Sequence, residues 1–210
     1  MLRIIIADDH PIVRAGLKQI MAEASDLVVA AEASNGRELL NQVRRETYDV
    51  ILLDISMPGM DGLDVLKQLK IEKPHLPVVI LTAHPESQYA LRILKAGASG
   101  YLTKVSADND LIQAIRKVQR GGKYISPSLA EKIAFALDGD TQKQPHEILS
   151  DREYQVFCLI GAGRTVSQIA DELALSVKTV STYRSRILEK MHMDNNAELI
   201  HYAVQNNLVE

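Results

Sequence analysis

Five polar residues stand at the ends of short apolar runs in this 210-residue sequence, and together they have the chemistry needed to bind and accept phosphate. They are Asp8, Asp9, Asp54, Thr82 and Lys104. Carboxylates that cluster raise one another's pKa unless a cation neutralises them, and Mg2+ is a hard divalent ion that prefers oxygen ligands. A hydroxyl and an ammonium group can hold phosphoryl oxygens. Asp54 is therefore the predicted nucleophile, which would form a phosphoaspartate.

Each of these residues also has an ordinary structural explanation when it is considered alone. Adjacent acids usually lie in a solvated turn, a threonine at a strand end usually caps it, and a single lysine usually lies on the surface. The secondary structure predicted around these residues favours the chemical interpretation, because strand and helix patterns alternate five times before residue 120. Strands are predicted at residues 3–7, 28–33, 50–54, 78–82 and 100–103, and helices at 11–24, 37–45, 63–71, 87–95 and 108–119.

This alternation predicts an α/β fold, a five-stranded doubly wound parallel sheet with helices on both faces. The strands of such a sheet all end at one edge, which is where ligands bind. The five polar residues would therefore converge, although they are far apart in the chain. Pro58 and Gly59 follow Asp54 closely and predict a rigid turn that holds this carboxylate near the surface.

The composition is that of an ordinary globular protein, with 46% hydrophobic and 24% charged residues and a net charge of −3. This charge neither excludes nor requires a nucleic-acid partner. No apolar run approaches the ~18 residues of a membrane span and no signal peptide is present, so we expect a cytoplasmic protein without membrane contact. Cys158 is the only cysteine, which excludes an internal disulfide, and its apolar surroundings predict a buried, inert thiol.

A polar stretch without periodicity, residues 138–145, predicts a flexible tether between two domains. A short helical pattern opened by Ser126 precedes this tether and could act as a spacer. We therefore expect a first domain at residues 1–121, a linker with a short helix at 122–145, and a second domain at 146–210.

Four helices are predicted in the second domain from their capping residues, which are Ser150, Thr165, Ser176 and Asn195. The second and third of these helices are separated by residues 174–176 alone, which is the spacing of a helix-turn-helix. An apolar stripe on the third helix should face the other helices. The stripe comprises Val177, Val180, Ile187, Leu188 and Met191.

The opposite side of this third helix could bind DNA, because small hydroxyls and a lysine fit a major groove and nearby basic groups could meet phosphates. The candidate contacts are Lys178, Thr179, Ser181, Thr182, Tyr183, Arg184, Ser185, Arg186 and Lys190. An ordinary solvated face is the alternative. From residue 146 onward the chain has six basic and nine acidic residues, so one copy should bind DNA weakly and two copies would be needed.

Four motifs occur together in the first 120 residues: Asp8-Asp9, the run from Leu53 to Gly59, Leu81-Thr82-Ala83, and the run from Gly100 to Lys104. This set resembles the receiver domain of two-component response regulators, which has a flavodoxin-like fold. The resemblance implies that Asp54 is phosphorylated. It implies Mg2+ bound by Asp9 directly, by Asp8 mainly through water, by Asp54, and by the backbone carbonyl of Ser56. It also implies phosphoryl contacts from Thr82, Ala83 and Lys104, and a change of rotamer at Tyr101 when Thr82 moves.

One position departs from this family. Many receivers have a proline after the lysine, joined by a cis bond, whereas Val105 follows Lys104 here. A cis bond before a residue other than proline costs about 3–4 kcal/mol. Either the loop tolerates that strain or it has another conformation.

The second domain has its own set of motifs, at residues 149–153, 169–173, 176–180 and 188–191. They are similar to the DNA-binding domain of LuxR-type regulators. A receiver joined to this domain resembles the NarL/FixJ family, which implies that the third helix reads DNA and that the fourth contributes to dimerisation.

These observations predict a response regulator that a sensor histidine kinase phosphorylates and that binds double-stranded DNA as a homodimer to control transcription. It would not be an enzyme, apart from slow hydrolysis of its own phosphoaspartate. One alternative is a receiver whose output is protein binding. A less favoured one is a phosphatase with an aspartate nucleophile, because such enzymes usually have a second aspartate where this chain has Ser56.

Overall fold

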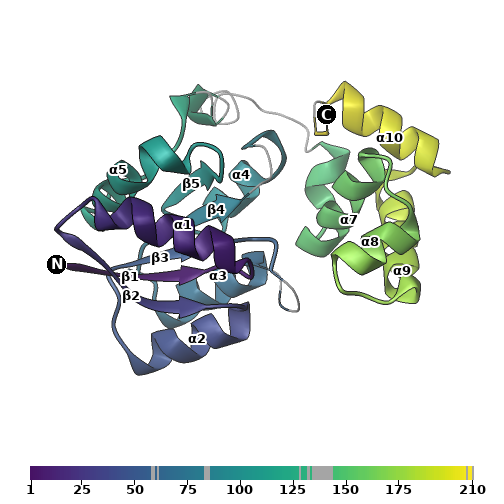
Figure 1. The fold of residues 1–210 in the computed structure, drawn as a ribbon. Helices are drawn as coiled ribbons and strands as arrows, with labels where there is room; N and C mark the ends of the chain where they lie inside the picture. Colours follow the sequence, from purple (N-terminus) through teal and green to yellow (C-terminus); the bar gives the residue numbers. More distant parts are fainter. Residues whose placement is uncertain are drawn as a thin grey trace. The chain divides into compact units, whose positions relative to one another are not determined.

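A computed structural model describes residues 1–57, 60, 62–82, 86–127, 129–131, 133, 144–206 and 208–209. The chain forms two compact units, Met1–Lys132 and Ile133–Glu210, shown in Figure 1 and described here one at a time. Most of the predicted spacer helix and tether, and Ala83 among the predicted site residues, lie outside the described residues. None of the described helices is both long enough and apolar enough to span a membrane.

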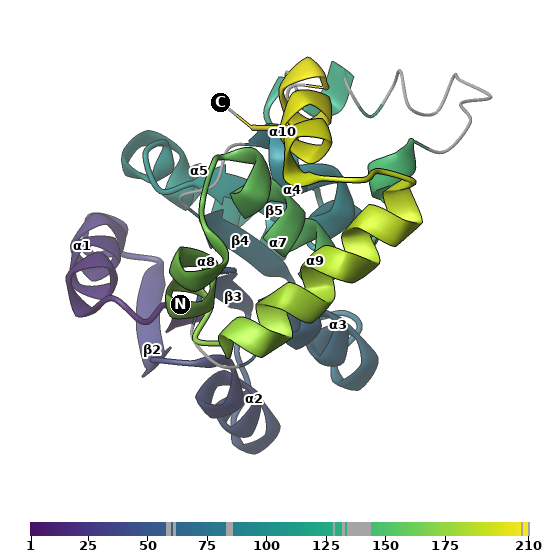
Figure 2. The same ribbon diagram turned by 90° about the vertical axis from the view of Figure 1, so that its right-hand side faces the viewer.

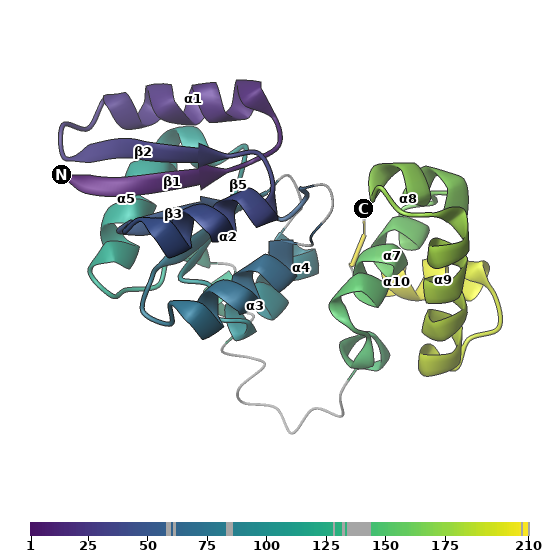
Figure 3. The same cartoon turned by 90° about the horizontal axis from the view of Figure 1, so that it is seen from below.

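The first unit contains a five-stranded sheet in the order β2-β1-β3-β4-β5, and every neighbouring pair is parallel. The strands are β1 (Leu2–Ala7), β2 (Leu27–Ala33), β3 (Val50–Leu53), β4 (Val78–Thr82) and β5 (Gly100–Thr103). Figure 3 shows β1 and β2 pointing the same way beneath α1 (Pro11–Ala22). The predicted five-stranded, doubly wound parallel sheet is thus confirmed.

Helices cover both faces of this sheet. They are α1, α2 (Gly36–Arg45), α3 (Gly62–Glu72), α4 (Glu86–Lys95) and α5 (Ala107–Gln119). Figure 1 shows α1 and α5 on one face, where Leu17 and Leu111 pack with Ile4 and Leu52 in a buried core. Figures 1 and 3 show α2 and α3 on the other face. Both faces of β3 are therefore covered, which is why its four residues are all apolar and buried.

The second unit is helical, as predicted. After the short 3-10 helix η1 (Pro145–Ile148) come α7 (Asp151–Gly161), α8 (Val166–Glu172), α9 (Val177–Met191) and α10 (Asn196–Gln205). Each of the four predicted caps accepts a hydrogen bond from the backbone N–H three residues on, and Ser150 and Thr165 form complete capping boxes. Figure 2 shows the short turn that joins α8 to the longer α9.

The predicted packing of α9 needs one correction. Val180, Ile187 and Met191 are buried, but Val177 is 51% exposed. Val177 is the first residue of the helix, so the buried stripe begins one turn later, at Val180. The predicted burial of Cys158 is confirmed, since it is one of the buried residues of α7.

Candidate functional sites in the two units

Strand register brings the predicted acidic residues together. β1 and β3 pair so that Ala7 lies opposite Leu53, which puts the next residues, Asp8 and Asp54, side by side at the edge of the sheet. β4 and β5 pair so that Thr82 lies opposite Thr103, and Lys104 follows directly. The backbone N–H of Lys104 donates to the carbonyl of Thr82 (2.8 Å). Residues from four strand ends therefore meet at one place.

The Lys104 ammonium joins the two buried carboxylates. Its Nζ lies 2.8 Å from Asp54 Oδ2 and 2.7 Å from Asp8 Oδ2. The Asp54 side chain is only 1% exposed. The expectation that Asp54 lies near the surface was therefore wrong, because the neighbouring strand ends and the Lys104 side chain enclose it. The backbone N–H of Ser56 donates to Asp54 Oδ1 (3.1 Å), which fixes the second carboxylate oxygen.

Burial and pairing act in opposite directions on these groups. Burial raises the pKa of the Asp54 carboxyl, and its bonds to Lys104 and Ser56 offset only part of this rise. Burial lowers the pKa of the Lys104 ammonium, but its ion pairs with Asp54 and Asp8 more than reverse this, so that its pKa is raised. The pocket thus holds more negative charge than one ammonium neutralises.

This acidic pocket, formed by Asp8, Asp9, His10 and Asp54, can hold a divalent cation. Ligand atoms of Asp8, Asp9, His10 and Asp54 all lie within 4.8 Å of one another. Asp8 Oδ2 and Asp9 Oδ1 are buried and, within the described part of the chain, no group reaches them with hydrogen-bond geometry. Lys104 Nζ lies 2.7 Å from Asp8 Oδ2 and His10 Nδ1 lies 2.8 Å from Asp9 Oδ1, but neither contact has hydrogen-bond geometry. Carboxylate oxygens with spare lone pairs fit a hard ion such as Mg2+.

His10 is the member of this cluster that the sequence reasoning missed. Its Nδ1 lies 2.8 Å from Asp9 Oδ1 and 3.3 Å from Asp8 Oδ1, and its backbone N–H donates to Asp8 Oδ1 (2.8 Å). The available signal was its position directly after Asp8-Asp9, in front of the proline that opens α1.

Thr82 and Tyr101 are both enclosed, with exposed fractions of 0% and 1%. Thr82 ends β4, and Tyr101 lies in β5 opposite Ile80. The backbone N–H of Tyr101 donates to the Tyr124 carbonyl (3.0 Å). The peptide bond between Lys104 and Val105 is trans, as is every peptide bond between described residues. The loop after Lys104 therefore has another conformation than the one with a cis bond.

The outer side of α9 is exposed as predicted at Lys178, Ser181, Thr182, Ser185 and Arg186. Two of the predicted phosphate contacts are instead used inside the unit. Lys190 Nζ lies 2.6 Å from the buried carboxylate of Glu153, and Arg184 Nε donates to Asn196 Oδ1 (2.6 Å). Tyr183 is partly buried, and the Thr179 hydroxyl lies 2.7 Å from that of Ser176 at the start of the helix.

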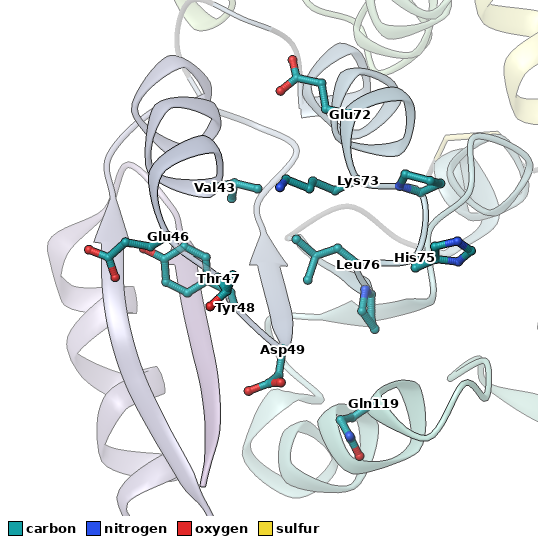
Figure 4. A pocket seen from close by; sticks show the side chains of 12 residues that line it. Val43, Glu46, Thr47, Tyr48, Asp49, Glu72, Lys73, His75, Leu76 and Gln119 are labelled. Carbon is teal, nitrogen blue, oxygen red and sulfur yellow. The ribbon is translucent and has the colours of Figure 1, made fainter.

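A hollow of about 470 Å³ lies at the other edge of the sheet, where β3 and β4 begin. Figure 4 shows the Lys73 side chain extending toward Val43 across it. Its three acidic residues are engaged: Glu46 pairs with Arg3, Glu72 pairs with Arg44, and Asp49 accepts a hydrogen bond from the backbone N–H of Arg3. These pairs leave the hollow without the concentrated charge of the acidic pocket.

Two family models match the chain. The response regulator receiver domain matches residues 4–116, and the bacterial regulatory proteins of the luxR family match residues 147–203. These two matches cover the acidic pocket and the α8–α9 pair.

Curated relatives match over the whole chain. The response regulator GacA of Pseudomonas protegens is 39% identical and covers 100% of this chain and 99% of its own length. The response regulator UvrY of Escherichia coli K12 is 34% identical, with 99% and 96% coverage. Among solved structures, RcsB from Salmonella enterica serovar Typhimurium bound to the promoter rprA with the phosphomimetic BeF3− is 29% identical, with a TM-score of 0.66 and coverage of 96% and 98%.

Proposed function

The chain belongs to the response regulators that combine a receiver domain with a LuxR-type regulatory domain, and from this premise we propose that it accepts a phosphoryl group on Asp54 and controls transcription by binding duplex DNA. A sensor histidine kinase is the proposed donor. The observation that carries the proposal is the contact of Lys104 with both Asp54 and Asp8, because an ammonium beside a carboxylate nucleophile can hold the incoming phosphoryl oxygens.

In the proposed reaction an Asp54 carboxylate oxygen attacks the phosphorus of a phosphohistidine. A P–O bond forms, the P–N bond breaks, and the histidine nitrogen keeps the electron pair and takes a proton from solvent. Lys104 exchanges its bond to Asp54 for one to a phosphoryl oxygen, and the Thr82 hydroxyl donates to another. Ala83 contributes a further contact, and Tyr101 changes rotamer as Thr82 moves.

Asp9, Asp54 and the carbonyl of Ser56 are the proposed ligands of Mg2+, and Asp8 would act mainly through water. When bound, the ion supplies positive charge to the phosphoryl oxygens and the carboxylates. Slow hydrolysis of the acyl phosphate would return the protein to its starting state, so the chain would be a switch rather than an enzyme with an external substrate.

Phosphate incorporation from a small-molecule phosphodonor with Mg2+ tests the assignment of Asp54. We expect wild type to incorporate label and Asp54→Asn to incorporate none. Asp64→Asn is the matched control, since Asp64 is an exposed aspartate in the first turn of α3. Label on Asp54→Asn, or its loss from Asp64→Asn, would contradict the assignment.

For the second unit we propose that α9 enters the major groove, with Lys178 and Arg186 as the main phosphate contacts. Arg184 and Lys190 are weaker candidates, because each already has a partner within the unit. The proposed DNA-facing set is completed by Thr179, Ser181, Thr182, Tyr183 and Ser185. Two copies would bind together, since the unit is net acidic overall.

The proposed domain limits are 1–121 for the receiver, 122–145 for the linker and 146–210 for the DNA-binding domain. The proposed location of the protein is the cytoplasm.

Retention on random duplex DNA at several salt concentrations tests this part. Each phosphate contact that is removed should reduce the slope of log K against log salt by about 1. We expect that reduction for Lys178→Ala and for Arg186→Ala. Arg120→Ala, an exposed arginine of the first unit, is the control. Unchanged slopes in both α9 variants would instead favour a protein-binding output.

A further inference from the structure

The exposed side of α9 has hydroxyl groups whose protons are already in use. The Thr182 hydroxyl donates to the carbonyl oxygen of Lys178 (2.9 Å), and the Ser185 hydroxyl donates to that of Ser181 (3.1 Å). Both bonds run back by four residues along the helix, a pattern that serine and threonine commonly form. Thr182 and Ser185 are nevertheless exposed, so their oxygen atoms remain accessible from outside.

This arrangement limits what the two hydroxyls can recognise. A hydroxyl has one proton and two lone pairs. Because each proton is given to a helix carbonyl, the outward side of each oxygen can only accept a hydrogen bond. The Thr179 hydroxyl is also engaged, with Ser176 at the helix start.

The bases that could satisfy such acceptors form a defined class. In the major groove, adenine presents its N6 amino group and cytosine its N4 amino group, whereas guanine and thymine present acceptors, and thymine also a methyl group. We propose that Thr182 and Ser185 determine sequence specificity by accepting hydrogen bonds from these amino groups. The protein would then prefer adenine or cytosine to guanine or thymine at the contacted position of one strand. This inference rests on the proposed binding of duplex DNA.

Position along the helix implies that Thr182 contributes more to base specificity than Ser185 does. Base edges are contacted mainly by the N-terminal part of a recognition helix. Thr182 lies six residues after the cap Ser176, and Ser185 lies a turn further on. Thr182 also has a methyl group, which can contact a thymine methyl group on a neighbouring base pair.

The test uses the full chain with Mg2+ and beryllium fluoride, and selects binding sites from a pool of duplexes with a randomised centre. Wild type should select one orientation of the base pair at the Thr182 position, with adenine or cytosine on the strand that Thr182 contacts. Thr182→Val keeps the shape but has no acceptor, and should lose about threefold to tenfold of this preference at that position alone, the range expected for one hydrogen bond. Thr182→Ser keeps the hydroxyl and should retain the preference.

A base analogue checks the same contact from the DNA side. Purine in place of adenine, or pyrimidin-2-one in place of cytosine, removes the amino group. It should weaken wild-type binding by the same factor and leave Thr182→Val unaffected. Ser185→Ala provides a second variant, with its own position in the site. Circular dichroism and the melting temperature of each variant show that it is folded.

Two results would overturn the inference while leaving DNA binding intact. One is an unchanged base preference in both Thr182→Val and Ser185→Ala. The other is wild-type binding that stays unchanged when purine or pyrimidin-2-one replaces the amino-bearing base on either strand of the selected base pairs. Absence of salt-dependent retention on random duplex, by contrast, would contradict the proposed DNA binding itself and the base preference with it.

Discussion

At the scale of single residues, the acidic pocket is a compromise between burial and charge. Asp54 and Asp8 are both nearly inaccessible, and one ammonium group serves both. Burying a carboxylate costs free energy that pairing recovers only in part. The raised pKa of Asp54 reflects that deficit. Binding a further cation, or neutralising the charge of Asp54, would therefore lower the free energy of the pocket.

We predict that Asp54→Asn stabilises the first unit at pH 7. The folded pKa of Asp54 lies above its ordinary value of 3.8, so its charged form destabilises the fold at neutral pH, and protonation removes this cost as pH falls. The melting temperature should rise by roughly 4 °C, the shift that about 1 kcal/mol produces in a domain of this size. The difference from wild type should shrink as pH falls toward 3.8.

Thermal melts monitored by circular dichroism between pH 4 and pH 7 would measure this effect, with Asp64→Asn as the control. A variant less stable than wild type at neutral pH would mean that the bond to Lys104 outweighs the cost of burial.

At the scale of secondary structure, the start of α3 holds the loop that carries Asp54. A Cβ on Gly62 would lie 2.5 Å from Ile55 Cα and 2.9 Å from the Asp54 carbonyl oxygen. Both are backbone atoms, which cannot move aside as a flexible side chain would. The absence of a side chain at this position therefore lets α3 pack directly against the backbone of Asp54 and Ile55.

We predict that Gly62→Ala destabilises the first unit by about 1–3 kcal/mol, the usual cost of overpacking. It should also slow phosphate incorporation, because the clash displaces the backbone of Asp54. Gly16→Ala is the matched control, since nothing lies within 4 Å of a Cβ there and Gly16 is inside α1. That change should stabilise by about 0.5–1 kcal/mol. Chemical denaturation measures both, and equal effects in the two variants would refute the argument.

In the second unit, Glu153 links α7 to α9. Its carboxylate accepts from the backbone N–H of Ser150 (2.8 Å) and from Lys190 Nζ (2.6 Å), and its side chain is 3% exposed. Burial raises the pKa of Glu153, but these bonds lower it by more than burial raises it, so the net shift of the pKa is downward. The interaction therefore stabilises the fold whenever the carboxylate is charged.

We predict that Glu153→Gln costs the second unit about 1–3 kcal/mol at pH 7. A depressed folded pKa means that this contribution is complete above the ordinary value of 4.5 and is lost as pH falls through the folded pKa. The gap between wild type and variant in urea denaturation should therefore narrow only below pH 4.5. Glu172→Gln, an exposed position at the end of α8, is the control, and a gap that stays constant into acid would contradict the prediction.

At the scale of the whole molecule, the two units have separate cores, so we predict that they unfold in separate steps. Mg2+ should raise the melting temperature of the first unit alone, by an amount that corresponds to about 2.7 kcal/mol at a hundred times its dissociation constant. Glu153→Gln should lower only the other transition. Differential scanning calorimetry with Mg2+ and with EDTA would measure this. Equal shifts of both transitions would show that the units unfold together.

The sequence by itself determined most of the secondary structure and the parallel, doubly wound class of the sheet. Caps such as Ser150 and Thr165, and the apolar run of β3, act through neighbours a few residues away, so local chemistry suffices to predict them. The convergence of Asp8, Asp54 and Lys104 also followed from sequence, because parallel strands all end at the same edge.

Only the tertiary structure decided which side chains touch. It buried Asp54 beneath Lys104, brought His10 to the acidic pocket, and paired Lys190 with Glu153 and Arg184 with Asn196. The reason is physical: such contacts depend on strand register, helix packing and rotamers, which differences of a few ångströms change and which no pattern along the chain records.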